Sequence, residues 1–320
     1  MAHLIESMAY IGAKPWHGLG NVLTPKRPLE VWIQEAGMDW DIQEAAVKYV
    51  AGKGLDTIHA YPEQKVLYRS DTHAPLSVVS QRYQVVQPRE VLEFYRDLTE
   101  VSGFALETAG VLKGGKKFWA LARTGQETTL PGKDRVLGYL LLATSCDGTL
   151  ATTATPTTIR VVCNNTLSIA LNGASGAIKV PHSTSFNAQA VKTQLGIAVS
   201  SWDSFMIQMK TLASRKVRPT EATTYLTEVL NVGVNPVAGR QVMLNEKTLQ
   251  KVYSLFDGQG NGAELPSSKG TAWGLLNAVT EFVDHKRRSR SEENRLDSAW
   301  FGQGSAMKQK ALDLAIQLAA

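Results

Sequence analysis

The sequence predicts an α+β fold: a curved antiparallel sheet with hairpins over residues 1–180, followed by a mainly α-helical part over residues 187–320. Three observations support this prediction. Before residue 180, short apolar runs alternate with turn residues, as they do in strands. Paired glycines or an Asp-Gly turn separate strand-like segments. After Pro181, apolar residues recur at spacings of three and four, which is the period of helices.

The first elements are short and end at turn residues. We expect one helix and then three strands, at residues 28–36, 46–50, 65–68 and 83–86 respectively. Pro88 then occupies the favoured first position of a helix predicted over residues 88–99. One face of that helix is apolar and carries Val91, Leu92, Tyr95 and Leu98.

Two hairpins give the clearest local signals. In the first, strands at 106–112 and 118–122 flank a turn in which Gly114 and Gly115 supply the positive φ angles that a tight turn needs. In the second, a strand at 136–144 meets an Asp-Gly turn, after which a Thr-rich stretch leads into residues 158–171. Because threonine favours strands, we expect a curved antiparallel sheet here.

The helical part begins with a heptad pattern over residues 187–216. Its apolar positions are Val191, Leu195, Ala198, Trp202, Phe205, Met209 and Leu212. The pattern fits a long helix packed on its own domain or a coiled coil with another chain, and we favour the first because roughly three to four heptads are the lower limit for the second. Further helices are expected at 220–230, 245–256, 271–286 and 305–318, each beginning near a capping residue.

Composition limits the class of protein. The 320 residues are 43% hydrophobic, enough for a substantial core, and no apolar run approaches the roughly 20 residues that span a bilayer. We therefore expect a cytoplasmic protein that is neither secreted nor membrane-spanning. Cys146 and Cys163 are too few for a disulfide framework and lack zinc-ligating neighbours. The net charge of +5 favours anionic partners without requiring one.

Two patterns that suggest ligands lack an essential part. Residues 110–117 nearly match a phosphate-binding loop, but Lys117 stands where a Ser or Thr would hold magnesium, and a strand-like segment follows instead of a helix. Glu281 and His285 lie four residues apart on a predicted helix, yet no second group of ligands can be identified. We therefore predict no nucleotide hydrolysis, no metal and no cofactor.

Basic residues gather in two places. The denser cluster is Lys286, Arg287, Arg288 and Arg290, with Arg295 beyond; the second is Lys210, Arg215, Lys216 and Arg218. Two interpretations stay open. The clusters either contact phosphates, with salt-sensitive binding, or are solvated helix ends.

Aromatic residues stand beside cations at Arg82-Tyr83 and at Lys116-Lys117-Phe118-Trp119. Proteins that bind single-stranded nucleic acid combine stacking surfaces with cations in this way. Successive side chains of a strand point to opposite faces, so we expect one of Phe118 and Trp119 to be buried and the other to be available to a ligand, a partner or a second layer.

Several segments resemble, in order and nearly end to end, the phage and plasmid family catalogued as domain of unknown function 932. They are Pro15–Gly20, Ser80–Tyr83, Ser145–Gly148, Thr157–Leu167 and Thr271–Gly274. The resemblance implies a role in mobile-element DNA metabolism but no established activity. Cys146 stands where the family's Asp-Gly turn has histidine, which weakens any enzymatic interpretation that relies on that histidine. The order of sheet and helices is also loosely similar to phage single-strand annealing proteins of the Rad-fifty-two type.

The leading hypothesis is a non-catalytic protein of phage or plasmid recombination or replication that binds, or also anneals, single-stranded DNA and assembles as a homo-oligomer. The candidate contacts are Arg82, Tyr83, Lys113, Lys116, Lys117, Trp119, Arg160, Lys286, Arg287, Arg288 and Arg290. One alternative is a metal-dependent phage nuclease that uses Asp147, Glu281, Asp284 and His285. Another is a protein-binding accessory factor, such as a host-defence antagonist.

Overall fold

The computed structural model describes residues 5–12, 20–52, 57–100, 103–162, 165–168, 170–171, 174–175, 177–199, 202–230 and 246–320. The chain divides into two compact units. Unit 1 comprises residues 1–125, 140–155 and 177–196, and unit 2 comprises residues 126–139, 156–176 and 197–320. The division does not fall at a single position, because three strands each contribute residues to both units.

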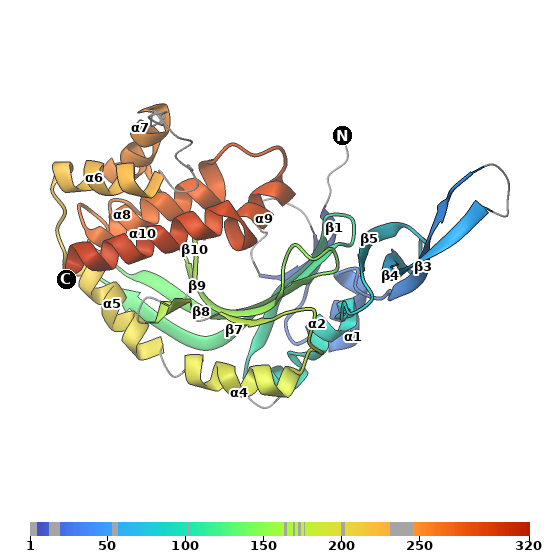
Figure 1. The fold of residues 1–320 in the computed structure, drawn as a ribbon. Coiled ribbons are helices and arrows are strands. Elements are labelled where there is room, and N and C mark those ends of the chain that lie inside the picture. Colours follow the sequence, from blue (N-terminus) through green and yellow to red (C-terminus); the bar gives the residue numbers. More distant parts are fainter. Residues whose placement is uncertain are drawn as a thin grey trace. The chain divides into compact units, whose positions relative to one another are not determined.

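The sheets confirm the predicted fold class (Figure 1): they are rich in antiparallel pairs and hairpins, and most helices lie in the C-terminal part of the chain. The largest sheet has the order β10-β9-β8-β7-β6-β1-β2, with β13 pairing β9. Its strands are β1 (Ile5–Ile11), β2 (Asn21–Leu23), β6 (Ala105–Leu112), β7 (Lys117–Leu130), β8 (Asp134–Ser145), β9 (Thr152–Arg160), β10 (Asn165–Ser168) and β13 (Ile178–Val180). Two short strands, β11 (Ala170–Leu171) and β12 (Ala174–Ser175), pair separately.

The hairpin of β6 and β7 forms as its turn residues predict. Lys113, Gly114 and Gly115 all have positive φ angles, and the pairing begins at Leu112 opposite Lys117. The preceding prediction of a strand at 83–86 is wrong, because this segment has no regular structure before helix α2 begins at Pro88.

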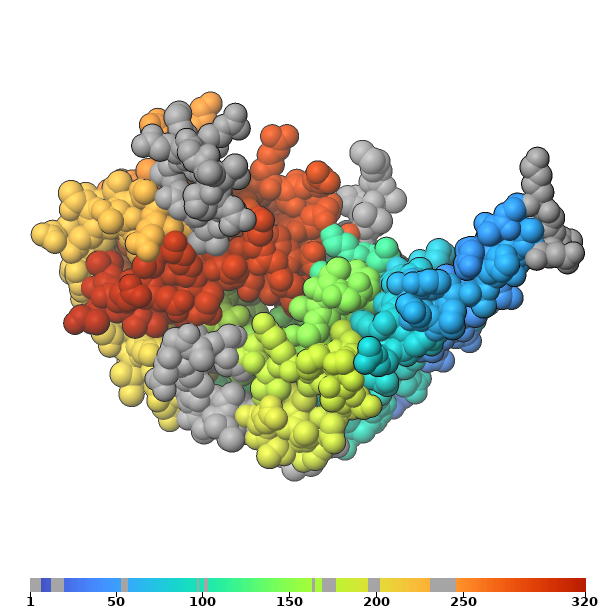
Figure 2. All heavy atoms as spheres, viewed as in Figure 1, coloured from blue at the N-terminus to red at the C-terminus, as the bar shows by residue number. Residues whose placement is uncertain are grey.

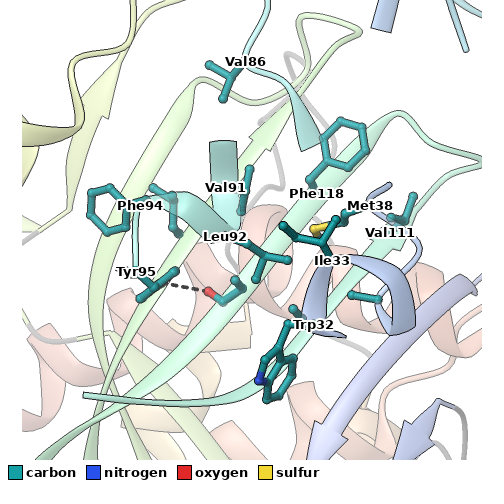
Figure 3. Close-up of a cluster of buried hydrophobic side chains, with 14 of the residues drawn as sticks. Trp32, Ile33, Met38, Val86, Val91, Leu92, Phe94, Tyr95, Val111 and Phe118 are labelled. Carbon is teal, nitrogen blue, oxygen red and sulfur yellow. Dashed lines mark hydrogen bonds between the residues drawn. The ribbon is translucent and has the colours of Figure 1, made fainter. Parts of the chain in front are cut away.

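The core of unit 1 packs three short helices against the sheet: α1 (Leu29–Glu35), α2 (Pro88–Glu93) and α3 (Arg96–Glu100). The predicted helix over 88–99 is thus interrupted. Trp32, Leu92 and Phe118 lie in this core (Figure 3). The Tyr95 hydroxyl, also in the core, lies 3.0 Å from the carbonyl oxygen of Ala120, and burial raises the pKa of Tyr95.

A three-stranded antiparallel sheet in unit 1 is formed by β3 (Ile42–Val50), β4 (Ile58–Arg69) and β5 (Pro75–Ser80). The half of the β3–β4 hairpin nearest its tip projects from the rest of unit 1 as an arm (Figures 1 and 2). Side chains on both faces of the arm are exposed, including Tyr49, which is 51% exposed, and Tyr61, which is 40% exposed. We call residues 47–50 and 58–61 the β-arm.

Unit 2 is mainly helical. Its helices are α5 (Trp202–Ser214), α6 (Pro219–Leu230), α7 (Glu246–Ser254), α8 (Ala272–Glu281), α9 (Glu292–Phe301) and α10 (Gln303–Ala319), with π-helical turns η2 (Leu255–Gln259) and η3 (Phe282–Lys286) after α7 and α8. Every residue of α8 is buried, and α8 packs against α5 and α10. Among the described residues, none of the helices is both long and apolar enough to cross a membrane.

The heptad pattern is distributed over two helices, α4 (Ala188–Val199) and α5, and residues 200 and 201 lie outside the described ranges. Val191 belongs to the core of unit 1. The positions on α5 belong to the core of unit 2; they are Trp202, Phe205, Met209 and Leu212. These five side chains pack within the chain, as the interpretation that we favoured predicts, but on two helices and in two cores instead of on one long helix in one domain.

Candidate nucleic-acid interface

Four of the candidate contacts are buried: Tyr83 is 9% exposed, Lys117 8%, Trp119 2% and Arg160 2%. The Tyr83 hydroxyl donates a hydrogen bond of 2.8 Å to the carbonyl oxygen of Ser145, and burial raises the pKa of Tyr83. Trp119 and its neighbour Phe118 are both buried, so of the three possibilities for the second side chain only cover by a second layer agrees with the structure. We therefore leave these four residues out of the interface.

The other candidates in unit 1 remain at its surface. Arg82 is exposed, while Lys113 and Lys116, in the turn between β6 and β7, are half-buried. Arg82 forms no ion pair within the described part of the chain. The segment Pro15–Leu19 and Cys163 lie outside the described residues.

Two of the segments that carry the family resemblance, Ser80–Tyr83 and Ser145–Gly148, meet in unit 1 through the hydrogen bond from the Tyr83 hydroxyl to the Ser145 carbonyl oxygen. The Ser145 hydroxyl donates to the carbonyl oxygen of Leu150 and accepts from the Leu150 amide, both at 3.0 Å, and this closes the Asp-Gly turn. Within that turn Cys146 is 1% exposed, and burial, with a smaller effect from Asp147, raises the pKa of the thiol to about 12. The turn thus has a structural role, and its thiol is protonated at neutral pH.

Two further segments of the resemblance meet at a buried carboxylate in unit 2. Arg160 Nε lies 2.8 Å from Asp134 Oδ1, and Arg160 Nη2 lies 2.8 Å from Asp134 Oδ2. The same Oδ2 atom accepts hydrogen bonds from Ser267 Oγ at 2.7 Å and from Trp273 Nε1 at 3.0 Å. Arg160 is thus committed to an internal ion pair instead of a phosphate.

The start of α8 explains the segment Thr271–Gly274. Thr271 Oγ1 accepts a hydrogen bond of 3.1 Å from the Gly274 amide and so caps the helix. A Cβ atom on Gly274 would lie 2.0 Å from the carbonyl oxygen of Ser268, which leaves room for glycine only. Together with the Asp134 contacts, these interactions make the resemblance segments of unit 2 a buried polar framework.

The acids considered for a metal site are already engaged. Lys308 Nζ lies 2.8 Å from Asp284 Oδ1, and the Thr166 amide donates to Asp284 Oδ2 at 2.8 Å. Glu281 Oε2 accepts a hydrogen bond of 2.8 Å from the Asn261 amide. Among the residues that the structure describes, no three His, Cys, Asp or Glu side chains are grouped to hold a metal ion. The nuclease alternative thus lacks a donor set in those residues.

The basic segment 286–290 follows η3 and is the strongest candidate for an interface. Lys286, Arg288 and Arg290 are exposed, and Arg287 is half-buried. None of these four side chains forms an ion pair with a carboxylate in the described ranges. The exposed charges of Lys286, Arg288 and Arg290 are therefore available to an anion in solvent.

The second basic cluster differs, because most of its side chains already form ion pairs or hydrogen bonds within unit 2. Arg215 and Arg218 both lie 3.0 Å from Glu221 Oε1. The hydrogen bonds from Arg218 and Arg215 lower the pKa of Glu221 to about 2. Lys216 Nζ donates to the carbonyl oxygen of Lys269 at 3.1 Å. Only Lys210 in this cluster is exposed with no hydrogen-bond or ionic partner among the described residues.

A cavity of about 350 Å³ opens beside the basic segment. Its lining contains four arginines and no carboxylate. The lining residues are Val283, Arg287, Arg288, Ser289, Arg290, Asn294, Arg295 and Ser298. Sequence reasoning identified the arginines but not the cavity, because the fold of residues 286–291 against α9 has no sequence signature that we recognised.

The aromatic face of the β-arm was also missed. The rings of Tyr49 and His59 stack with centroids 5.3 Å apart, and Tyr61 lies opposite Val47, two residues along the same face. The sequence did contain a signal for this face. His59 and Tyr61 are two residues apart, which is the spacing of side chains on one face of a strand.

The chain was compared with protein families, curated proteins and solved structures. The model of the family described as Domain of unknown function (DUF932) matches residues 75–300. That range includes the Asp134 framework and the basic segment. No curated protein and no solved structure matches the chain significantly.

Proposed function

We propose that this chain, which belongs to the DUF932 family, is a non-catalytic protein that binds single-stranded DNA in phage or plasmid recombination or replication. The observation that carries the proposal is the basic segment 286–290, whose four cations have no carboxylate partner in the described part of unit 2. Cations of this kind bind phosphates and release condensed counterions, so the affinity falls steeply with added salt.

The β-arm supports a single strand over a duplex. Bases stack on aromatic side chains with about 1–3 kcal/mol per base, and an unpaired strand presents base faces that a duplex hides. Tyr49 and Tyr61 are 51% and 40% exposed, so their rings are accessible. In the proposal the β-arm of unit 1 supplies a stacking surface for bases, and the basic segment of unit 2 independently supplies cations for phosphates.

The proposal is tested by fluorescence anisotropy with one labelled oligonucleotide, offered single-stranded and as a duplex, over a range of salt concentrations. We expect tighter binding to the single strand. The double variant R288E/R290E should lose about tenfold or more in affinity and show a shallower salt dependence. Its matched control, K210E/K247E, changes the net charge equally at exposed positions on α5 and α7. Undetectable binding at low salt, or equal losses in both variants, rejects the proposal.

Self-association is part of the proposal, since several copies on one strand would align many weak sites. Light scattering with and without oligonucleotide measures it. The same samples, incubated with magnesium or manganese, separate binding from the nuclease alternative: an intact oligonucleotide supports binding, and a shortened one supports the nuclease. Recovery of one host protein without nucleic acid would instead favour the accessory-factor alternative.

A further inference from the structure

The cavity beside α9 has the chemistry of an oxyanion site. Four of its eight lining residues are arginines, and none is acidic. Its volume of about 350 Å³ lies at the lower end of the range for ligand pockets. Arginine donors in a fork geometry match the oxygens of a phosphate, so one charged tetrahedral group fits this lining better than an apolar ligand does.

Arg287 has an unfilled hydrogen-bonding capacity. Its Nη1 atom is buried and has no hydrogen-bond partner among the described residues, while Nη2 lies 3.3 Å from Gln303 Oε1. A buried donor left without an acceptor costs free energy. Arg287 is one of the residues that line the cavity, so we take an oxyanion bound there as the missing acceptor of the Arg287 guanidinium.

Arg295 fixes the loop that shapes the cavity. Its Nη1 donates to the carbonyl oxygens of His285 at 2.8 Å and Arg287 at 2.7 Å, and its Nε pairs with Glu292 at 3.1 Å. These bonds occupy much of the Arg295 guanidinium, whose side chain is 15% exposed. Arg295 is therefore a positioning residue, and Arg287 is left as the donor for a ligand.

We propose that this cavity binds a single phosphate group through Arg287, with Arg288 and Arg290 completing the charge around it. Where the phosphate belongs to a DNA strand, the inference rests on the proposed function, because the cavity is then the phosphate-binding subsite of the basic segment. The same chemistry also accepts free inorganic phosphate, and the two sources are separated by experiment.

The test titrates inorganic phosphate into the full chain by calorimetry and then uses phosphate to displace a labelled single strand. We expect one phosphate per chain. The variant R287Q should weaken phosphate binding by about tenfold or more, since a charge-assisted hydrogen bond is lost. K210Q, which removes one charge from α5 outside the cavity, should bind phosphate as the parent does. R287K retains the charge without the fork and should give an intermediate affinity. Unchanged thermal melting of the variants without phosphate shows that they are folded.

The outcomes separate the two claims. Phosphate binding that R287Q weakens, without any DNA binding, leaves the cavity site standing and rejects the proposed function. A second outcome is DNA binding without phosphate binding, with R287Q lowering the DNA affinity no more than K210Q does. That outcome rejects the cavity site and leaves the proposed function standing. Equal losses of phosphate affinity in R287Q and K210Q also overturn the site, because the effect is then one of overall charge.

Discussion

Arg160 and Asp134 form an ion pair of 2.8 Å inside unit 2, with side chains that are 3% and 0% exposed. Breaking such a pair leaves a buried charge without compensation. We expect Arg160→Met to lower the free energy of unfolding by about 3–5 kcal/mol, measured by urea denaturation.

The matched control is Arg135→Met, because Arg135 pairs with Glu127 at 2.8 Å with both side chains 48% exposed. An exposed pair contributes about 0–1 kcal/mol. Similar losses in the two variants would contradict a special role for the buried pair.

The cap of α8 gives a second prediction. Thr271 Oγ1 accepts from the Gly274 amide and lies 2.7 Å from the carbonyl oxygen of Ser267. Thr271→Ala should therefore lower the free energy of unfolding by at least about 1 kcal/mol. Thr271→Ser keeps the hydroxyl and should recover most of that loss; a serine variant as unstable as the alanine variant would show that the methyl group matters more than the cap.

Ionisation of the Cys146 thiol lowers the free energy of unfolding at high pH. Its thiol has a pKa of about 12 in the folded chain and of about 8.5 when unfolded. Between these values the unfolded chain loses the proton more readily, so ionisation favours unfolding and stability decreases as the pH rises above about 8.5.

The measurement is urea denaturation between pH 7 and pH 10 in a Cys163→Ser background, with and without Cys146→Ala. The alanine variant should lose less stability over this range, and Ellman's reagent should react with Cys146 only after unfolding. Rapid reaction of the native thiol at pH 8 would disprove its protection.

Asp71 has the opposite dependence on pH. The hydrogen bonds from Arg69 lower the pKa of Asp71 to about 2, and the two side chains lie 2.7 Å apart. The folded state therefore favours the ionised carboxylate, so this contribution is complete above the unfolded pKa of about 3.9 and is lost as the pH falls towards about 2. The difference in urea midpoint between the parent and Asp71→Asn should shrink between pH 5 and pH 2. A constant difference would mean that the pair does not titrate as inferred.

The sequence predicted the fold class and the cap of α8 because these depend on local signals. Gly114 and Gly115 mark a turn whatever surrounds it, and Thr271 caps α8 through an amide three residues away. Helix α9 was not predicted, since its acidic and basic residues hide the apolar period. Its cap, Ser291, accepts from the Asn294 amide at 3.1 Å and was a usable signal.

Burial was harder to predict than secondary structure. Arg160 and Trp119 have the residue types of a nucleic-acid contact, yet Arg160 is neutralised by Asp134, 26 residues earlier in the chain. A strand covered on both faces has no exposed side, so the alternation rule does not identify an available aromatic residue there. The basic segment 286–290 was easier to find, because a dense run of cations seldom has enough nearby carboxylates to neutralise it.

The complete burial of α8 has a consequence for how unit 2 exchanges hydrogen with solvent. All ten of its residues are shielded, and its neighbours α5 and α10 must separate before water reaches its amides. These amides should take up deuterium only through cooperative opening of unit 2, while those of the β-arm exchange through local fraying. The slowest-exchanging protons of α8 thus report the global opening free energy of unit 2.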